Sequence, residues 1–220
     1  EEIMEYSIIW TLFLIGCAFI FFSYGKKIRK YQKIRKEQQI QYEDNREKYR
    51  HFTSELFDET PDEEMTHAVL FHIMGKEDKI FESDEIGNLI DVLTHSELLI
   101  YTIYQVELSL EGGRGSLHTF FIKEPYCTYR PYVKEAFEAV DCHEIAELMV
   151  AADKLATAIE NDEEIDIDDG SDYGNYNFSD FTNALASALK TSGILLKAAK
   201  FIREHKDEFI DAEDKEENDE

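Results

Sequence analysis

A stretch of nineteen residues without a charge, residues 6–24, constrains the fold of this chain more than any other feature. It contains no proline, and at about 1.5 Å per residue a helix of that length covers the hydrocarbon core of a bilayer. A short tail, residues 1–5, precedes it, and a dense basic run follows it. We therefore expect residues 6–24 to form a single transmembrane helix that contacts the lipid bilayer.

The residues that flank this segment predict which side of the membrane the rest of the chain occupies. Lys and Arg next to a membrane span stay on the cytoplasmic side, and aromatic side chains lie at the two interfaces. The residues expected to anchor the chain in this way are Trp10, Tyr24, Lys26, Lys27, Arg29 and Lys30. The sequence thus predicts a single-pass protein of the cell membrane whose C-terminal domain lies in the cytoplasm.

Other interpretations of the apolar segment stay open. Leu14–Cys17 fits the lipobox that ends in a lipidated cysteine, but cleavage before Cys17 would leave an apolar start. The basic residues also follow the apolar part, whereas in a cleaved signal they precede it. A buried helix of a soluble fold is the remaining alternative.

The two parts of the chain carry opposite charge. Residues 1–50 hold ten Lys and Arg and seven Asp and Glu, whereas residues 51–220 hold 13 and 41. Residues 25–50 are rich in helix-forming charged residues with few apolar ones, which predicts a charged juxtamembrane stalk, helical or merely solvated. A coiled-coil dimer of the stalk stays open, although sustained a and d positions are lacking. Residues 211–220 form a like-charge run that we expect to be a disordered tail.

Capping signals and apolar spacing divide residues 51–210 into an all-α domain of six to eight helices. We expect the first of these helices to end at Gly75 and the last to turn Leu195 towards the core. The residues expected to begin helices are Thr60, Ser83, Thr94, Pro131, Asp141, Ser179 and Ser192. Residues 98–108 are rich in β-branched and aromatic residues, but the capping box at Thr94 favours a helix there.

No sequence pattern indicates catalysis. The seven histidines form neither an H-E-x-x-H motif nor a zinc-type pair with cysteine. Neighbouring side chains on a helix diverge, so Cys142–Glu144 cannot present a nucleophile and a base in one geometry. The acidic segment Asp166–Asp169 is out of register with a calcium loop, and the glycines at 112–115 lack the Lys-Ser/Thr of a phosphate loop. We expect no catalytic residue, no metal and no cofactor.

Carboxylates recur every third residue across two predicted helices. These residues are Glu135, Glu138, Asp141, Glu144 and Glu147. Such a series forms either a solvated face that keeps the domain soluble or a negative surface for a basic partner. A field of this sign raises association rates with cations and repels nucleic acid, so we expect no direct nucleic-acid binding.

Residues 97–210, about half of the chain, resemble the DNA mimic protein 19-like family in the order of their features. The resemblance rests on the helix "IYTIYQVELSL", on the junction "AFEAVDCHEIAELMVAADKL" and on the closing helix "KFIREHKDEFI". A glycine motif of the family has its counterpart in Gly115, Ser116, Leu117, Phe120 and Phe121, of which Gly115 and Phe121 are retained outright. The resemblance implies an all-α fold and a protein-binding role in which carboxylates stand in for DNA phosphates, without catalytic residues.

Two functional hypotheses follow. The first is a membrane-anchored interaction module whose acidic domain binds a basic or DNA-binding protein. The second is a structural or immunity-type accessory protein that binds a specific partner through an apolar groove near Tyr126, Tyr129 and Tyr132, with acidity serving only solubility. Salt dependence separates the two, because interactions between exposed charges are screened by salt.

Overall fold

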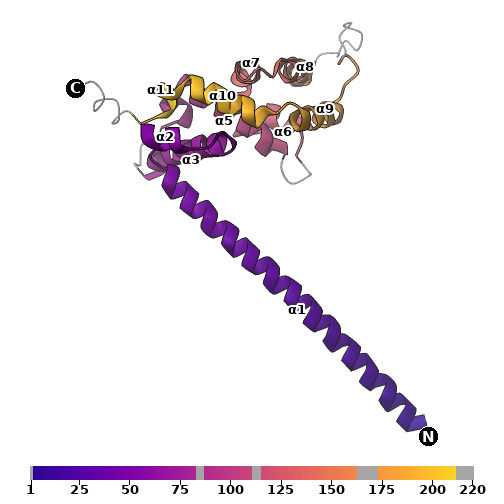
Figure 1. Cartoon of the computed structure of the whole chain (residues 1–220). Helices are drawn as coiled ribbons and strands as arrows, with labels where there is room; N and C mark the ends of the chain where they lie inside the picture. The colour runs from indigo at the N-terminus through magenta and orange to yellow at the C-terminus, as the bar shows by residue number, and fades with distance from the viewer. Residues whose placement is uncertain (1, 83–86, 111–114, 163–172, 212–220) are drawn as a thin grey trace. The chain divides into compact units, whose positions relative to one another are not determined.

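The computed structural model of the chain describes residues 2–82, 87–110, 115–162 and 173–211, and it describes side chains for residue 24 and from residue 27 onward in these ranges. Within them the chain is all-helical, with eleven α-helices, one 3-10 helix and no strand (Figure 1). Two compact units, Glu1–Glu47 and Lys48–Glu220, make up the chain. The all-α fold class is thereby confirmed.

The first unit consists of helix α1 (Glu2–Tyr49) up to Glu47. At about 1.5 Å per residue its 48 residues extend over roughly 70 Å. Its isolated apolar side chains are exposed, among them Ile28 at 53% and Tyr31 at 66%, as expected for a stalk with too few apolar residues to form a core.

The predicted membrane span, residues 6–24, lies within α1, but its side chains up to residue 23 are outside the described ones. Among the residues that the structure does describe, no helix combines the length and the apolar character needed to cross a membrane.

The second unit packs ten α-helices and one 3-10 helix around one apolar core in the described residues. The elements are α2 (Ser54–Glu59), α3 (Asp62–Glu82), α4 (Leu89–Val92), α5 (His95–Leu110), α6 (Leu117–Ile122), η2 (Tyr126–Tyr132), α7 (Val133–Ala139), α8 (His143–Glu160), α9 (Phe178–Thr191), α10 (Ile194–Glu204) and α11 (Lys206–Phe209). The domain has more helices than the predicted six to eight because it includes four short ones. These are α2, α4, α6 and α11, each four to six residues long.

Helix α5 is the centre of this core. Eleven of its 16 residues are buried, and it contacts α3, α6, α7, α11 and η2. The predicted capping box begins it, since the Glu97 N–H donates to Thr94 Oγ1 at 3.2 Å and the Thr94 N–H donates to Glu97 Oε2 at 2.9 Å. Buried phenylalanines from α2, α6, α7, α9 and α11 add to the same core.

Several predicted helix limits are wrong, for local reasons. Helix α3 continues through Gly75 to Glu82, and a Cβ at Gly75 would lie 3.2 Å from Arg50 Cγ. The glycine therefore makes room for Arg50. Thr60 closes α2 instead of capping α3, because its hydroxyl donates to the Leu56 carbonyl at 2.6 Å.

Further start signals differ from the prediction. Ser192 ends α9 as its C-cap, and Gly193 holds the N-cap position of α10. Asn88 caps the short helix α4, and Ser83, where a longer helix was expected to begin, is outside the described residues. Asn177, with Asp180 three residues later, forms the capping box of α9 instead of Ser179. Pro131 lies within η2, directly before α7.

Two hydrogen bonds join the end of the domain to its beginning. The Asp211 N–H donates to the Phe52 carbonyl at 3.1 Å, and the Phe52 N–H donates to Asp211 Oδ2 at 3.1 Å. Asp211 is therefore ordered, although we expected the disordered tail to begin there. The rest of that tail, residues 212–220, is outside the described residues.

Candidate functional site: the acidic face of α7 and α8

The candidate site lies where α7 ends and α8 begins. Val133, Ala136 and Phe137 turn one side of α7 into the core, which leaves Glu135 and Glu138 on the outside. Likewise Ile145 and Leu148 of α8 are buried. Because apolar residues at helical spacing fix the inner face of each helix, the carboxylates between them must face solvent.

A tight turn joins the two helices. Asp141 has a positive φ of 54°, which lets the Cys142 N–H donate to the Phe137 carbonyl at 2.8 Å. Asp141 was expected to cap α8, but Cys142 holds the N-cap position without a side-chain hydrogen bond. The strained conformation of Asp141 is one that Asp and Asn tolerate better than most residues do.

All five predicted carboxylates are exposed, and we call Glu135, Glu138, Asp141, Glu144 and Glu147 the acidic face.

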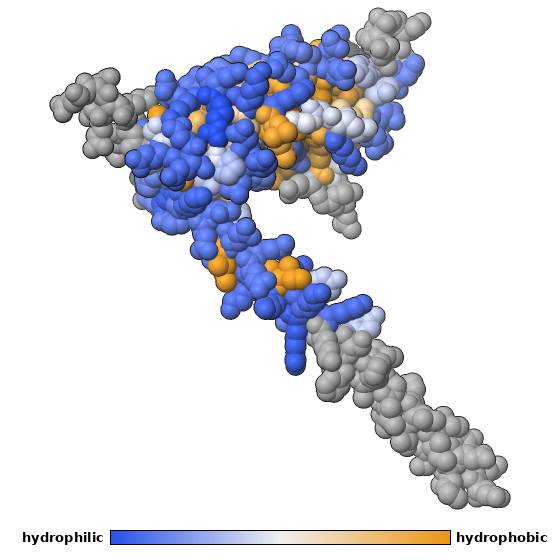
Figure 2. All heavy atoms as spheres, viewed as in Figure 1, coloured by the Kyte–Doolittle hydropathy of each residue, from blue (hydrophilic) through white to orange (hydrophobic). Residues whose placement is uncertain are grey.

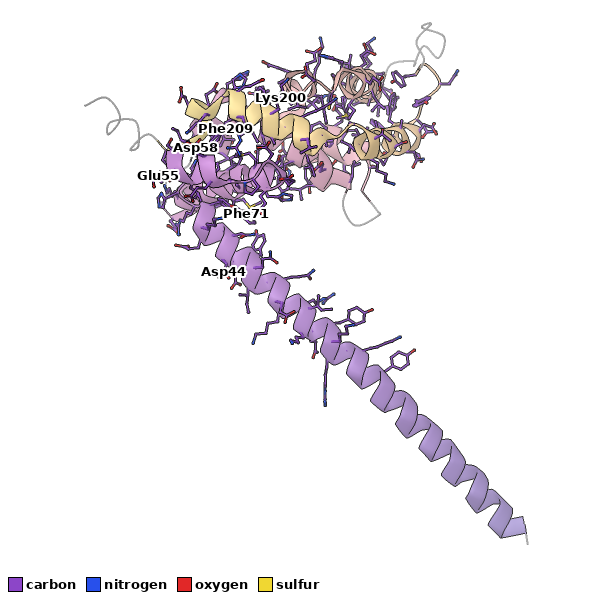
Figure 3. All side chains as sticks on the ribbon, viewed as in Figure 1. Asp44, Glu55, Asp58, Phe71, Lys200 and Phe209 are labelled. Carbon is purple, nitrogen blue, oxygen red and sulfur yellow. The ribbon has the colours of Figure 1, made fainter. Side chains whose placement is uncertain are left out.

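Three of the five have basic neighbours. Glu135 Oε1 lies 2.8 Å from His95 Nε2, Glu138 Oε1 lies 3.6 Å from Lys134 Nζ, and Asp141 Oδ2 lies 3.8 Å from Lys200 Nζ. Lys200 projects from α10 on the side of the domain that carries α7 and α8 (Figure 3). Exposed pairs of this kind contribute little to stability and leave the carboxylates open to competition from a partner.

Glu144 and Glu147 are different. They lie three residues apart in the first two turns of α8, both exposed, and neither belongs to an ion pair among the described residues. Residues at this spacing are neighbours on a helix surface, so the two charges reinforce each other. They contribute two charges to the acidic face that no described basic side chain pairs with.

The residues of the glycine motif are structural. A Cβ at Gly115 would lie 2.2 Å from the Ser109 carbonyl oxygen, so only glycine fits against the end of α5. Ser116 holds the N-cap position of α6, and the Leu117 N–H donates to Thr182 Oγ1 of α9 at 3.0 Å. Leu117, Phe120 and Phe121 are fully buried. The motif joins α5, α6 and α9, and its three apolar side chains are turned into the core.

The three tyrosines expected to line an apolar groove are also mainly structural. Tyr129 is 7% exposed and packs edge-on against Tyr101 with ring centroids 5.4 Å apart. Burial raises the pKa of Tyr129 to about 12. Tyr126 and Tyr132 are half-buried against the same core. These side chains therefore contribute mainly to packing.

A buried polar network, which sequence reasoning missed, ties α3 to α5. Glu97 is completely buried, and Lys76 Nζ donates to its two carboxylate oxygens at 2.7 and 2.8 Å. His72, 2% exposed, lies with Nε2 3.6 Å from Glu97 Oε1 and 3.8 Å from Asp211 Oδ1. Burial, followed by the nearby Lys76 charge, lowers the pKa of His72. The network is a structural link, because its charges face one another inside the domain.

Arg130 makes a second internal link, between η2 and α8. Its guanidinium pairs with Asp153, with both oxygens of Glu160 at 2.9 Å and with Thr157 Oγ1 at 2.6 Å. The carboxylates in the second half of α8 are therefore occupied, in contrast to Glu144 and Glu147 at its start.

The side chains near the site offer little chemistry. Cys142 is buried, and burial raises the pKa of its thiol, which disfavours the reactive thiolate. His143 and Glu144 point outward from α8. Among the described residues no group of three or more His, Cys, Asp or Glu could hold a metal ion, and the segment Asp166–Asp169 lies outside those residues.

Comparison with known proteins yields no match: no family model, no curated protein and no solved structure is significantly similar to the chain.

Proposed function

We propose that this protein is an acidic protein-interaction module that binds a basic protein, such as a DNA-binding protein, through the acidic face. The observation that carries the proposal is the pair Glu144 and Glu147, exposed side by side without an ion-pair partner among the described residues. The surrounding domain adds to their field, since residues 51–220 hold 41 acidic and 13 basic residues. A basic partner that approaches this face replaces weakly held counterions with its own charges.

The mimicry of DNA implied by the resemblance gives this binding a physical form. Carboxylates on a helix present negative charge at a regular spacing, and the DNA-binding surface of a protein carries Lys and Arg at positions that contact phosphates. The proposal needs neither a metal nor a catalytic residue, and we expect no enzymatic activity.

We further propose that residues 6–24 anchor this module in the cell membrane as a single transmembrane helix. The support is the uncharged apolar sequence and the basic run from Lys26, from which the positive-inside rule predicts a cytoplasmic domain. The test is fractionation of cells that express the full chain. A protein that carbonate extracts from the membrane fraction, or that protease cleaves in intact cells, would contradict the anchor or its orientation.

Binding is tested by capture from an extract of the source cells on the full-length chain, at about 50 mM and about 500 mM salt. We expect basic nucleic-acid-binding proteins to be retained at low salt and released at high salt. The double variant Glu144→Gln/Glu147→Gln should retain them poorly.

The matched control is Glu55→Gln/Glu59→Gln, which removes the same charge from two exposed positions on α2. Figure 3 shows Glu55 at the end of the domain that also carries Asp58 and Phe209. If the two double variants lose the same amount of binding, only the net charge of the domain matters for retention. Retention that salt does not change would refute binding by the acidic face.

A further inference from the structure

A shallow apolar groove opens where the first turns of α10 cross between α3 and α5. Thr66 and Leu70 of α3, Ile100 and Ile103 of α5, and Ile194 and Leu195 of α10 line it. Figure 2 shows apolar surface on the face that α10 crosses. The groove is distinct from the acidic face of α7 and α8 and from the three tyrosines of η2.

The rim of this groove exposes large aliphatic side chains. Leu195 is 47% exposed and the next residue, Leu196, is 60% exposed. We expected Ile194, Leu195 and Ala198 all to face the core. Ile194 and Ala198 do so, whereas Leu195 does not. A pair of exposed leucines beside an apolar hollow is typical of a surface that is covered by a partner.

The charges beside the groove define what can cover it. Glu107 of α5 lines the groove, and Glu63 is exposed one turn before Thr66 on α3. The nearby lysines of α10 turn towards α7, where Lys197 Nζ donates to the Asp141 carbonyl at 2.7 Å and Lys200 Nζ lies 3.8 Å from the Asp141 carboxylate. The groove is therefore apolar at its base, with the exposed Glu63 carboxylate beside its α3 edge.

We propose that this groove binds the apolar face of a basic amphipathic helix from the partner protein. Such a helix would lay aliphatic side chains at i, i+3 and i+4 spacing over the hollow and against Leu195 and Leu196, and its Lys or Arg side chains would meet Glu63. A second copy of the chain fits less well, because two domains with this excess of carboxylates repel each other. The inference rests on the proposed function and adds the shape that the partner must have.

The test uses a fluorescent Leu/Lys peptide of about 18 residues, five turns of amphipathic helix, and a peptide of the same composition with scrambled order. Full-length protein in zwitterionic lipid nanodiscs is titrated against each peptide, with empty discs as the blank. We expect the amphipathic peptide to bind more tightly than the scrambled one, and the double variant Leu195→Gln/Leu196→Gln to weaken its binding about ten-fold or more.

The matched control is Val92→Gln/Ile159→Gln, which replaces two aliphatic side chains, each 47% exposed, on α4 and α8. It should change the affinity less than about two-fold. Equal weakening in both double variants, or no binding to the wild-type protein, would overturn the groove proposal. Sedimentation could also show that the wild-type protein is a dimer and that the leucine variant, but not the control variant, is a monomer. That result would assign the groove to a second copy of the chain and would overturn the proposal too.

The outcomes also separate this inference from the proposed function. If peptide binding is salt-sensitive and the leucine variant leaves it unchanged, the groove proposal is refuted and the acidic face is left as the binding surface. Salt-resistant binding that the leucine variant abolishes would retain the groove and refute a function based on charge.

Discussion

Lys76→Met should be among the most destabilising single substitutions in the domain. It removes two short hydrogen bonds, at 2.7 and 2.8 Å, from a carboxylate that has no exposed surface. Glu97 would then keep the Thr94 N–H at 2.9 Å as a donor, with His72 3.6 Å away. Breaking a buried ion pair costs about 3–5 kcal/mol, and because Lys76 is 23% exposed we expect the lower end, about 3 kcal/mol.

The assay is reversible denaturation followed by circular dichroism, in which a loss of this size lowers Tm by about 6–12 °C for a domain of this length. Lys134→Met is the control, because its pair with Glu138 is 3.6 Å long and exposed, and should cost less than about 0.5 kcal/mol. The effect of Lys76→Met should also shrink as the pH falls from about 7 to about 5.5, because the Lys76 charge lowers the pKa of His72 and its removal lets His72 bind a proton beside Glu97.

A pH-independent loss that equals the loss in Lys134→Met would refute this account of the network. It would mean that the Glu97 carboxylate is stabilised mainly by the N-terminus of α5, where the Thr94 N–H donates to it.

Three further predictions test other parts of the domain. Gly115→Ala should lower the free energy of unfolding by at least about 2 kcal/mol in chemical denaturation, because the new Cβ would lie 2.2 Å from the Ser109 carbonyl oxygen, and an unchanged midpoint would contradict that packing. Thr66→Val should raise Tm, with a gain of roughly 1 kcal/mol, because the buried Thr66 hydroxyl has no hydrogen-bond partner among the described residues, and a lower Tm would show that the hydroxyl is needed. Folded His72 has a lowered pKa whereas the unfolded side chain titrates near about 6.5, so acidification below that pH favours unfolding. Wild-type stability should accordingly fall more steeply with decreasing pH than that of His72→Gln, and His67→Gln, at an exposed position, should follow the wild type.

Local signals in the sequence predicted the helices well where a cap and an apolar stripe agree. Thr94 and Glu97 form the expected capping box, and Ile145 with Leu148, which recur at helical spacing in the sequence, are buried in α8. The all-α class follows from such agreement repeated along the chain. Capping chemistry involves residues three positions apart, so it can be read from a short segment alone.

Where several caps compete, the sequence did not identify the one that is used. Asn177 and Ser179 are both good N-cap residues, and Asp180 at the third helical position decides for Asn177. Gly75 resembles a helix stop, but it serves the approach of Arg50 from 25 positions earlier in the chain. Such a contact depends on the tertiary fold and leaves no local trace in the sequence.

The same limit explains why the sequence did not predict the buried network of Glu97, Lys76 and His72. Glu97 was recognised as a capping residue, but Lys76 and His72 belong to another helix, and only the packing of α3 on α5 brings them together. The exposure of Leu195 has the same origin. Ile194 and Leu195 lie about 100° apart around the helix, so both cannot point to the centre of the core, and the packing of α10 on α3 buries Ile194 and leaves Leu195 partly exposed.

The distribution of the few basic residues narrows the surface that a partner can use. Arg130 occupies Asp153 and Glu160 in the second half of α8, and Arg203 pairs with Asp62 at 3.0 Å. A partner must compete with a guanidinium for these partly exposed carboxylates, whereas Glu144 and Glu147 have no ion-pair partner among the described residues. The attraction is therefore strongest at the first turns of α8, and a partner that binds there should depend on Glu144 and Glu147 far more than on the carboxylates that Arg130 and Arg203 hold.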